Sequence, residues 1–94
     1  MVKKDDQALT DLLDQVIVID TKGSMVTIGR LVRIAGDCLV LEDADVHDRE
    51  EGYSSKELYV INATKFGVRP NRRKVYIPRE SVVAVSALDD FIAD

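Results

Sequence analysis

The sequence has little that could support metal or thiol chemistry. Among its 94 residues there is one cysteine, Cys38, one histidine, His47, and no tryptophan. A single cysteine cannot form a disulfide within the chain, and these two residues cannot provide the three or four soft ligands of a usual zinc site. Nucleophile elbows and phosphate-binding loops are missing as well. We therefore expect no metal, no cofactor and no enzymatic activity.

Long apolar runs are also missing. No stretch approaches the ~20 apolar residues that a membrane-spanning helix needs. Residues 1–6 turn acidic where a secretory signal peptide requires its apolar segment. We therefore expect a cytoplasmic protein without a membrane partner. Apolar residues at 46% and charged residues at 32% are typical of a folded chain, and this length fits a single domain over residues 1–94.

Acidic side chains are in excess only in the first half of the chain. The formal net charge is −4, with 17 acidic and 13 basic side chains. Residues 1–52 carry −6, whereas residues 53–94 carry +2. General attraction to nucleic acid is therefore not expected, but a local basic patch is compatible with this distribution.

The first half of the sequence predicts one helix and three strands. Leucines at helical spacing indicate an amphipathic helix over residues 5–14. Residues 15–44 contain three runs rich in β-forming residues, separated by turns at Gly23 and Gly36. Gly29 lies within the second run, where a missing side chain permits a sharp bend. We expect three consecutive antiparallel strands, with the second from 25 to 35 and the third from 38 to 44.

The second half predicts an insertion followed by two more strands. Residues 45–74 are interpreted as a charged loop, a helix over 55–66 and a basic turn, although Leu58 to Ile61 is also compatible with a strand. Tyr59, Ala63 and Phe66 are expected on one packed helix face. Strands four and five are expected within residues 75–86, at 75–77 and 81–86, and residues 87–94 form a tail with one helical turn near 89–92. This order indicates a mainly β, small antiparallel barrel.

Two short motifs resemble those of the Sm and Sm-like family. Gly29-Arg30-Leu31 with residues 39–44 is similar to the family's first motif, and residues 75–79 with 82–85 are similar to its second. The chain looks like a divergent, bacterial-type member with a helical insertion between strands three and four. The resemblance implies a strongly bent, five-stranded barrel of the SH3 type with an N-terminal helix. It also implies a homo-oligomeric ring closed through strands four and five.

The resemblance further implies a place for RNA, but the sequence departs from the family's pattern there. Family members hold a uridine base with an Asp and an Asn from the loop after strand two and an Arg from the Arg-Gly pair of the second motif. Here Cys38 stands at the Asn position beside Asp37, and Pro78-Arg79 replaces Arg-Gly. A thiol is only a weak donor and a weak acceptor, so it cannot reproduce an amide that donates and accepts toward a base edge. Asp37 and Cys38 are therefore interpreted as a remnant of the pocket, and Arg79 as a candidate RNA contact.

The strongest functional signal is a cluster of basic residues before strand four. It consists of Lys65, Arg69, Arg72, Arg73 and Lys74. Such charges can hold the phosphates of single-stranded RNA, with Tyr76 or Phe66 as stacking surfaces. The alternative is a solvated turn that pairs with the acidic residues Asp48, Glu50 and Glu51.

Two functions remain open at this level. One is a non-catalytic, ring-forming protein that binds single-stranded RNA through the basic cluster. The other is a homo-oligomeric protein-interaction scaffold that has lost the family's RNA pocket. The group of Asp43, Asp45, His47 and Asp48 is interpreted as a solvated strand end rather than a cation or acid–base site.

Overall fold

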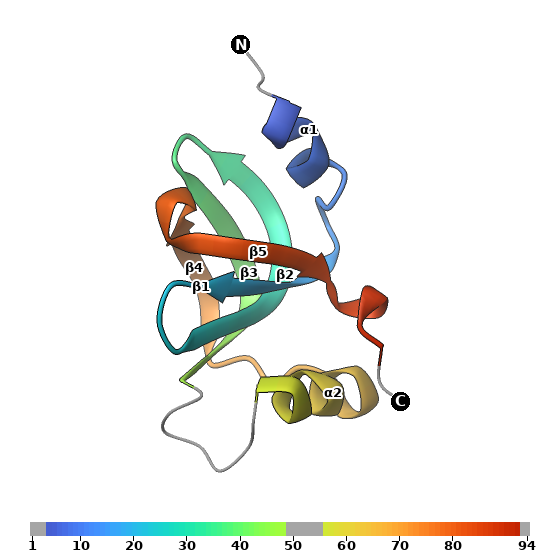
Figure 1. The fold of residues 1–94 in the computed structure, drawn as a ribbon. Coiled ribbons are helices and arrows are strands. Elements are labelled where there is room, and N and C mark those ends of the chain that lie inside the picture. The colour runs from blue at the N-terminus through green and yellow to red at the C-terminus, as the bar shows by residue number, and fades with distance from the viewer. Residues whose placement is uncertain (1–3, 49–55, 93–94) are drawn as a thin grey trace.

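The chain folds into a mainly β structure, with one short helix at each end of the sheet. A computed structural model describes residues 4–48 and 56–92. The elements in chain order are α1 (Lys4–Thr10), β1 (Val16–Thr21), β2 (Met25–Ala35), β3 (Cys38–Asp48), α2 (Lys56–Phe66), β4 (Arg72–Pro78), the 3-10 turn η1 (Arg79–Ser81), β5 (Val82–Ala87) and the 3-10 turn η2 (Leu88–Asp90). Figure 1 shows α1 and α2 at opposite ends of the strands.

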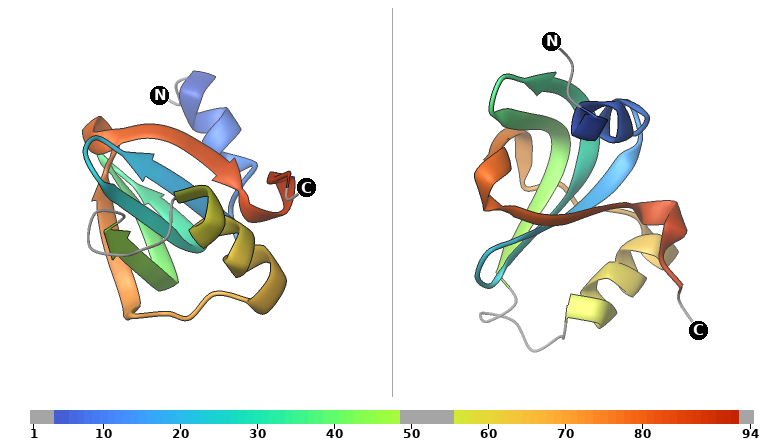
Figure 2. Two further views of the ribbon diagram at one scale, coloured as in Figure 1. Left: turned by 60° about the horizontal axis from the view of Figure 1, so that its bottom comes forward. Right: turned by 45° about the horizontal axis from the view of Figure 1, so that its top comes forward.

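The five strands form one antiparallel sheet in the order β4-β3-β2-β1-β5. The first three strands are joined by tight turns, whereas β5 crosses back to pair with β1 (Figures 1 and 2). The expected five-stranded, bent antiparallel fold is thereby confirmed. As a consequence of this order, β4 and β5 each have one edge that faces no other strand of the described chain.

The sheet bends sharply at Gly29, as expected. Gly29 is buried, and a Cβ atom at this position would lie 2.8 Å from the Cβ of Ala44 on β3. The pairing of β2 with β3 shifts register between Ile28 and Arg30 and again between Leu31 and Arg33. The missing side chain lets β3 approach β2 closely where the strands curve.

The core has two parts because β1 is buried on both faces. Ile17, Val18 and Ile19 are each 0% exposed although successive side chains of a strand point to opposite sides. The first part contains Ile17, Ile19, Leu31, Leu39, Leu41, Ala44 and Ile77, with Leu9, Leu12 and Leu13 packed against it. The second contains Val18, Val26, Ile28, Val60, Ala63 and Leu88, and it holds α2 against the sheet.

The N-terminal helix is shorter than expected. It ends at Thr10 rather than at residue 14. Asp14 has a φ of 67°, a left-handed value that no α-helix continues, and its N–H donates to the carbonyl oxygen of Leu31 over 2.7 Å. Since this bond ties the segment to β2, sheet pairing overrides the helical pattern.

Strands β3 and β4 are longer than expected. The prediction that the third strand ends at residue 44 was wrong. Strand β2 is long enough to pair with β3 as far as Asp48. The prediction that the fourth strand starts at residue 75 was wrong as well, because Lys74 pairs with Glu42 and Arg72 pairs with Ala44 in the β3–β4 ladder. Residues 72–74, expected in a basic turn, therefore lie in β4.

Helix α2 is confirmed over Lys56–Phe66, and the alternative strand over Leu58 to Ile61 is wrong. Gly67 ends the helix with a φ of 85°, and its N–H donates a hydrogen bond to the carbonyl oxygen of Ala63. Tyr59 and Ala63 pack against the core as expected, together with Val60, whereas Phe66 is 80% exposed. Because Phe66 is the last residue of α2, it extends past the core. Strand β5 (Val82–Ala87) is one residue later than expected, and the helical turn near the C-terminus is at 88–90.

No helix of the described residues is long and apolar enough to cross a membrane.

Candidate nucleic-acid interface

The structure separates the predicted site residues into two groups at opposite ends of β4. Arg72 begins the strand and Pro78 ends it. Six residue steps at roughly 3.3 Å each place these ends about 20 Å apart. Lys65, Arg69, Arg72, Arg73 and Lys74, here called the basic segment, lie at the α2 end. Asp37, Cys38, Pro78 and Arg79, here called the corner, lie at the other end.

The basic segment is exposed to solvent. All five of its side chains are exposed. Among the described residues, neither Arg69 nor Arg73 has a carboxylate partner, and Arg72 donates from Nη1 only to the carbonyl oxygen of Asn71 over 3.0 Å. Three guanidinium groups near the start of β4 are thus available to an anion.

Asn71 holds the start of the basic segment against β3. Its side-chain oxygen accepts the N–H of Val46 and its amide nitrogen donates to the carbonyl oxygen of Val46, both over 3.0 Å. Its own N–H donates to the carbonyl oxygen of Ala44 over 2.9 Å. Sequence reasoning missed Asn71. The available signal was an asparagine directly before a strand, because the Asn side chain can replace one peptide group of a neighbouring strand.

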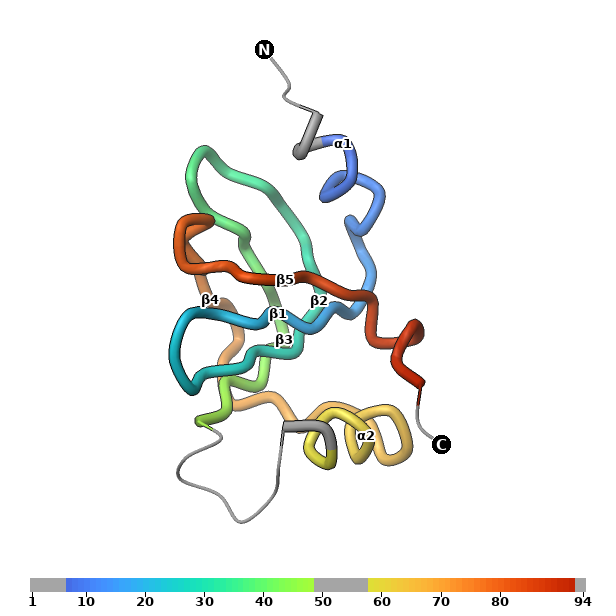
Figure 3. Tube along the Cα trace, viewed as in Figure 1, coloured from blue at the N-terminus to red at the C-terminus, as the bar shows by residue number. Residues whose placement is uncertain are grey.

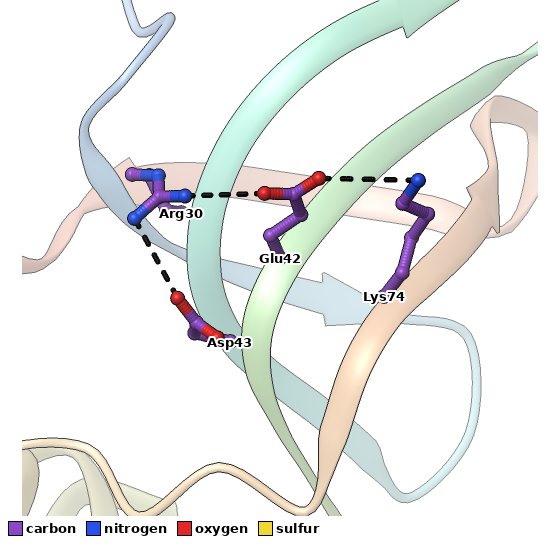
Figure 4. A network of polar contacts seen from close by, with 4 residues as sticks. All are labelled: Arg30, Glu42, Asp43 and Lys74. Carbon is purple, nitrogen blue, oxygen red and sulfur yellow. Dashed lines mark hydrogen bonds and ion pairs between the residues drawn. The ribbon is translucent and has the colours of Figure 1, made fainter.

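Lys74 differs from the arginines because it belongs to an ion-pair network. Its Nζ lies 3.9 Å from Oε2 of Glu42, and Oε1 of Glu42 accepts a 3.2 Å bond from Nη2 of Arg30. The other terminal nitrogen of Arg30 lies 3.6 Å from Asp43 (Figure 4). These side chains are partly exposed, so each pair contributes little stability. The network nevertheless compensates the charge of Lys74.

The corner joins the two sequence motifs in space. Cys38 pairs with Pro78 in the β3–β4 register, and the N–H of Arg79 donates to the carbonyl oxygen of Asp37 over 2.7 Å. Ser81 strengthens the turn by donating its hydroxyl to the carbonyl oxygen of Pro78 over 2.8 Å. Figure 3 shows the turn between β2 and β3 beside the turn between β4 and β5. Cys38 is a half-buried free thiol.

An aromatic cluster connects α2 to the end of β3. The hydroxyl of Tyr59 donates to Oδ2 of Asp45 over 2.6 Å, and the Tyr59 ring stacks on His47 with centroids 4.1 Å apart. Burial raises the pKa of the Tyr59 hydroxyl well above its usual range, and the hydrogen bond and charge of Asp45 raise it further. Among the described residues, no three His, Cys, Asp or Glu side chains are grouped closely enough to hold a metal ion.

The two end strands carry exposed apolar side chains. Tyr76 on β4 is 54% exposed and Val83 on β5 is 67% exposed. Within the described chain, neither strand has a partner on its outer edge. Such edges can pair with a strand of another chain, and apolar side chains on them favour that contact.

Similarity to solved structures identifies the fold. A Pyrococcus abyssii Sm protein in complex with a uridine heptamer is 20% identical, with a TM-score of 0.60 over 90% of this chain and 99% of that chain. The chain has an Sm-like fold. The P. aerophilum SmAP1 heptamer is 16% identical, with a TM-score of 0.57 over 93% of this chain and 96% of that chain. No protein-family model and no curated protein matches this sequence.

The Sm-like fold also occurs in a larger assembly. A chain of the NatC complex bound to CoA is 19% identical, with a TM-score of 0.56 over 93% of this chain and 86% of that chain. These similarities show the shape of the chain. In this Sm-like fold the corner contains the residues that the family resemblance relates to a base pocket, while the basic segment lies about 20 Å from it by strand length.

Proposed function

We propose that copies of this protein assemble through β4 and β5 into a closed homo-oligomeric ring that binds single-stranded RNA. The observation that carries the proposal is the strand order, which leaves one open edge on β4 and one on β5 within the described chain. Pairing β4 of one copy with β5 of the next is a heterologous contact, and such contacts form a closed ring when the rotation between neighbouring copies divides a full turn. Similarity to a heptameric protein of the same fold supports this arrangement.

The proposed RNA contact is the basic segment. Arg69, Arg72 and Arg73 provide the phosphate contacts, with smaller contributions from Lys65 and from Lys74, which already faces Glu42. Arg79, beside Asp37 and Cys38, is proposed as a separate contact. A ring repeats each contact in every subunit, so weak local attraction becomes avidity. Similarity to an Sm protein in complex with a uridine heptamer supports RNA as the ligand.

A charge-reversal experiment tests this function. Arg72→Glu with Arg73→Glu should abolish binding to short single-stranded RNA, measured by fluorescence anisotropy, and leave the assembly mass unchanged by light scattering. Lys22→Glu with Arg33→Glu is the matched control, because it changes the net charge equally at two other exposed positions. The proposal requires that the control still binds RNA. Equal RNA affinity in both double variants would contradict it.

The second candidate is a homo-oligomeric scaffold that binds proteins and no RNA. The net charge of −4, the thiol of Cys38 and similarity to a chain of the NatC complex favour it. It predicts intact rings that bind no RNA even at low salt, and no change in that respect on reversal of Arg72 and Arg73. Both candidates are non-catalytic; a substrate turnover that depends on His47 would contradict both.

A further inference from the structure

A cavity lies between α2 and β3, apart from the corner. Its volume is about 280 Å³, which is near the lower end for small-molecule sites and suits a flat group such as a nucleobase. Asp45 contributes from β3, and Tyr59, Asn62, Ala63 and Phe66 contribute from α2, with Arg69 following the helix. Figure 2 shows α2 beside the ends of the strands.

The cavity has an exposed aromatic ring in its wall. Phe66 is 80% exposed although it is a large apolar residue, whereas Ala63 beside it is buried. An exposed ring at a pocket is a surface on which a base can stack. Tyr59 also lines the cavity and is held in place by its contacts with Asp45 and His47.

Two polar side chains of the cavity, Asp45 and Arg69, determine which ligand chemistry fits it. Asp45 accepts the Tyr59 hydroxyl at Oδ2, and a carboxylate retains further acceptor positions but offers no donor. Adenine and cytosine carry an exocyclic amino group that such an acceptor can bind, whereas uracil and guanine carry a carbonyl oxygen at the corresponding position. Arg69 brings a guanidinium group that suits a phosphate.

We propose that this cavity binds one adenine or cytosine base of the RNA, stacked on Phe66 and read by Asp45. The flanking phosphate pairs with Arg69, so the cavity connects directly to the basic segment. This inference rests on the proposed RNA function. It adds a preference for adenine or cytosine over uracil at a site formed by α2.

Binding to three RNA homopolymers of equal length tests the proposal. Wild-type protein should bind oligoadenylate or oligocytidylate roughly tenfold more tightly than oligouridylate. Phe66→Ala should weaken the preferred RNA roughly 5- to 100-fold by removing the stacking surface. Ile92→Ala, which shortens another side chain that is 82% exposed, should change nothing. Equal binding of the three RNAs by wild type, or an unchanged affinity in Phe66→Ala, would overturn the proposal.

Asp45→Asn tests the readout without emptying the cavity. The amide keeps an oxygen that accepts the Tyr59 hydroxyl, and it adds a donor that uracil oxygens can accept. The preference against oligouridylate should therefore disappear, with unchanged assembly mass. Asp89→Asn, an exposed carboxylate elsewhere, is the control. A preference that survives in Asp45→Asn would overturn the assignment of Asp45.

Mononucleotides separate this proposal from the RNA function. Saturation-transfer difference NMR should show contact with adenosine or cytidine monophosphate in wild type, a weaker signal with uridine monophosphate, and no signal with Phe66→Ala. If no RNA binds but this pattern holds, the RNA function fails and the cavity assignment stands. If RNA binds and no mononucleotide gives a signal that depends on Phe66, the cavity assignment fails and the RNA function stands.

Discussion

Arg79 and Asp37 are joined by a 2.7 Å hydrogen bond between the N–H of the first and the carbonyl oxygen of the second. The bond links the turn after β4 to the turn before β3, so residues far apart in the sequence form one corner of the Sm-like fold. Since only backbone atoms take part, the bond does not depend on the side chain of either residue. Side-chain variants at Arg79 therefore test ligand binding and leave this link in place.

Arg79→Ala should weaken RNA binding on the order of tenfold, because a charge-assisted hydrogen bond to the RNA is lost. Arg79→Lys should recover part of the affinity if the group contacts a phosphate, since an ammonium ion preserves the charge. Fluorescence anisotropy measures both variants, and light scattering confirms that assembly is intact. If Arg79→Ala binds RNA with the affinity of the wild type, the side chain of Arg79 does not contact the RNA.

Gly29→Ala should lower the free energy of unfolding by about 1–3 kcal/mol, because the added Cβ would lie 2.8 Å from the Cβ of Ala44. Urea unfolding measures the change. Combining it with Ala44→Gly removes the closest clash, so the double variant should lose less stability than the sum of the single changes. Strictly additive losses would show that the approach of β3 at Gly29 is not the cause.

Val83→Pro should abolish assembly without unfolding the subunit. The β1–β5 register pairs Thr21 with Val82 and Asp20 with Ala84, so Val83 lies at the irregularity and has no partner of its own in this ladder of the described chain. Val82 has φ −82° and ψ 127°, a conformation compatible with a following proline. The proline removes an N–H from the open edge of β5. Light scattering should report the mass of a single chain.

Val83→Ala is the control for the assembly experiment, because it shortens the side chain and keeps the N–H. It should retain most of the assembly, and circular dichroism should show the same strand content in both variants. A Val83→Pro protein with the mass of the parent assembly contradicts pairing through β5.

Lys74→Ala should weaken RNA binding less than Arg73→Ala. The ammonium group of Lys74 lies 3.9 Å from Glu42, whereas Arg73 has no carboxylate partner among the described residues. We expect less than about twofold for Lys74 and about fivefold for Arg73, measured by anisotropy at one salt concentration. Equal losses would show that the Glu42 network does not compensate Lys74.

Stability should fall at alkaline pH through Tyr59. Burial raises the pKa of its hydroxyl in the folded protein, whereas the unfolded chain ionises near pH 10. Above about pH 10 the unfolded state therefore holds fewer protons than the folded state, and the free energy of unfolding decreases as pH rises. Tyr59→Phe should flatten this dependence in urea unfolding between about pH 9 and pH 11. Parallel curves would contradict the role of Tyr59.

The sequence predicted the strand framework because its signals are local and strong. The β-branched run at residues 16–19, the turn at Gly36 and the bend at Gly29 each specify one backbone arrangement, and all three are confirmed. Strand ends were predicted less well. Arg72 to Lys74 look like a solvated turn, but backbone pairing with β3 places them in β4.

The predicted site residues were separated by geometry that the sequence does not encode locally. Lys74 and Arg79 are five positions apart, yet the first faces Glu42 and the second bonds Asp37. Phe66 has the helical spacing of a core residue, but the helix ends there and leaves it exposed. The cavity beneath α2 was missed because it requires Asp45 on β3 and Arg69 after α2 to lie on one side of the molecule.

The salt dependence of RNA binding tests the central claim most directly. Each phosphate contact on a single strand contributes about −0.7 to the slope of log affinity against log salt. Replacing Arg72 and Arg73 by alanine should therefore make the slope shallower by about 1.4 for each subunit that the RNA contacts, with an unchanged assembly mass. A slope that is the same in wild type and the double variant, or no RNA binding by wild type at low salt, would contradict the account.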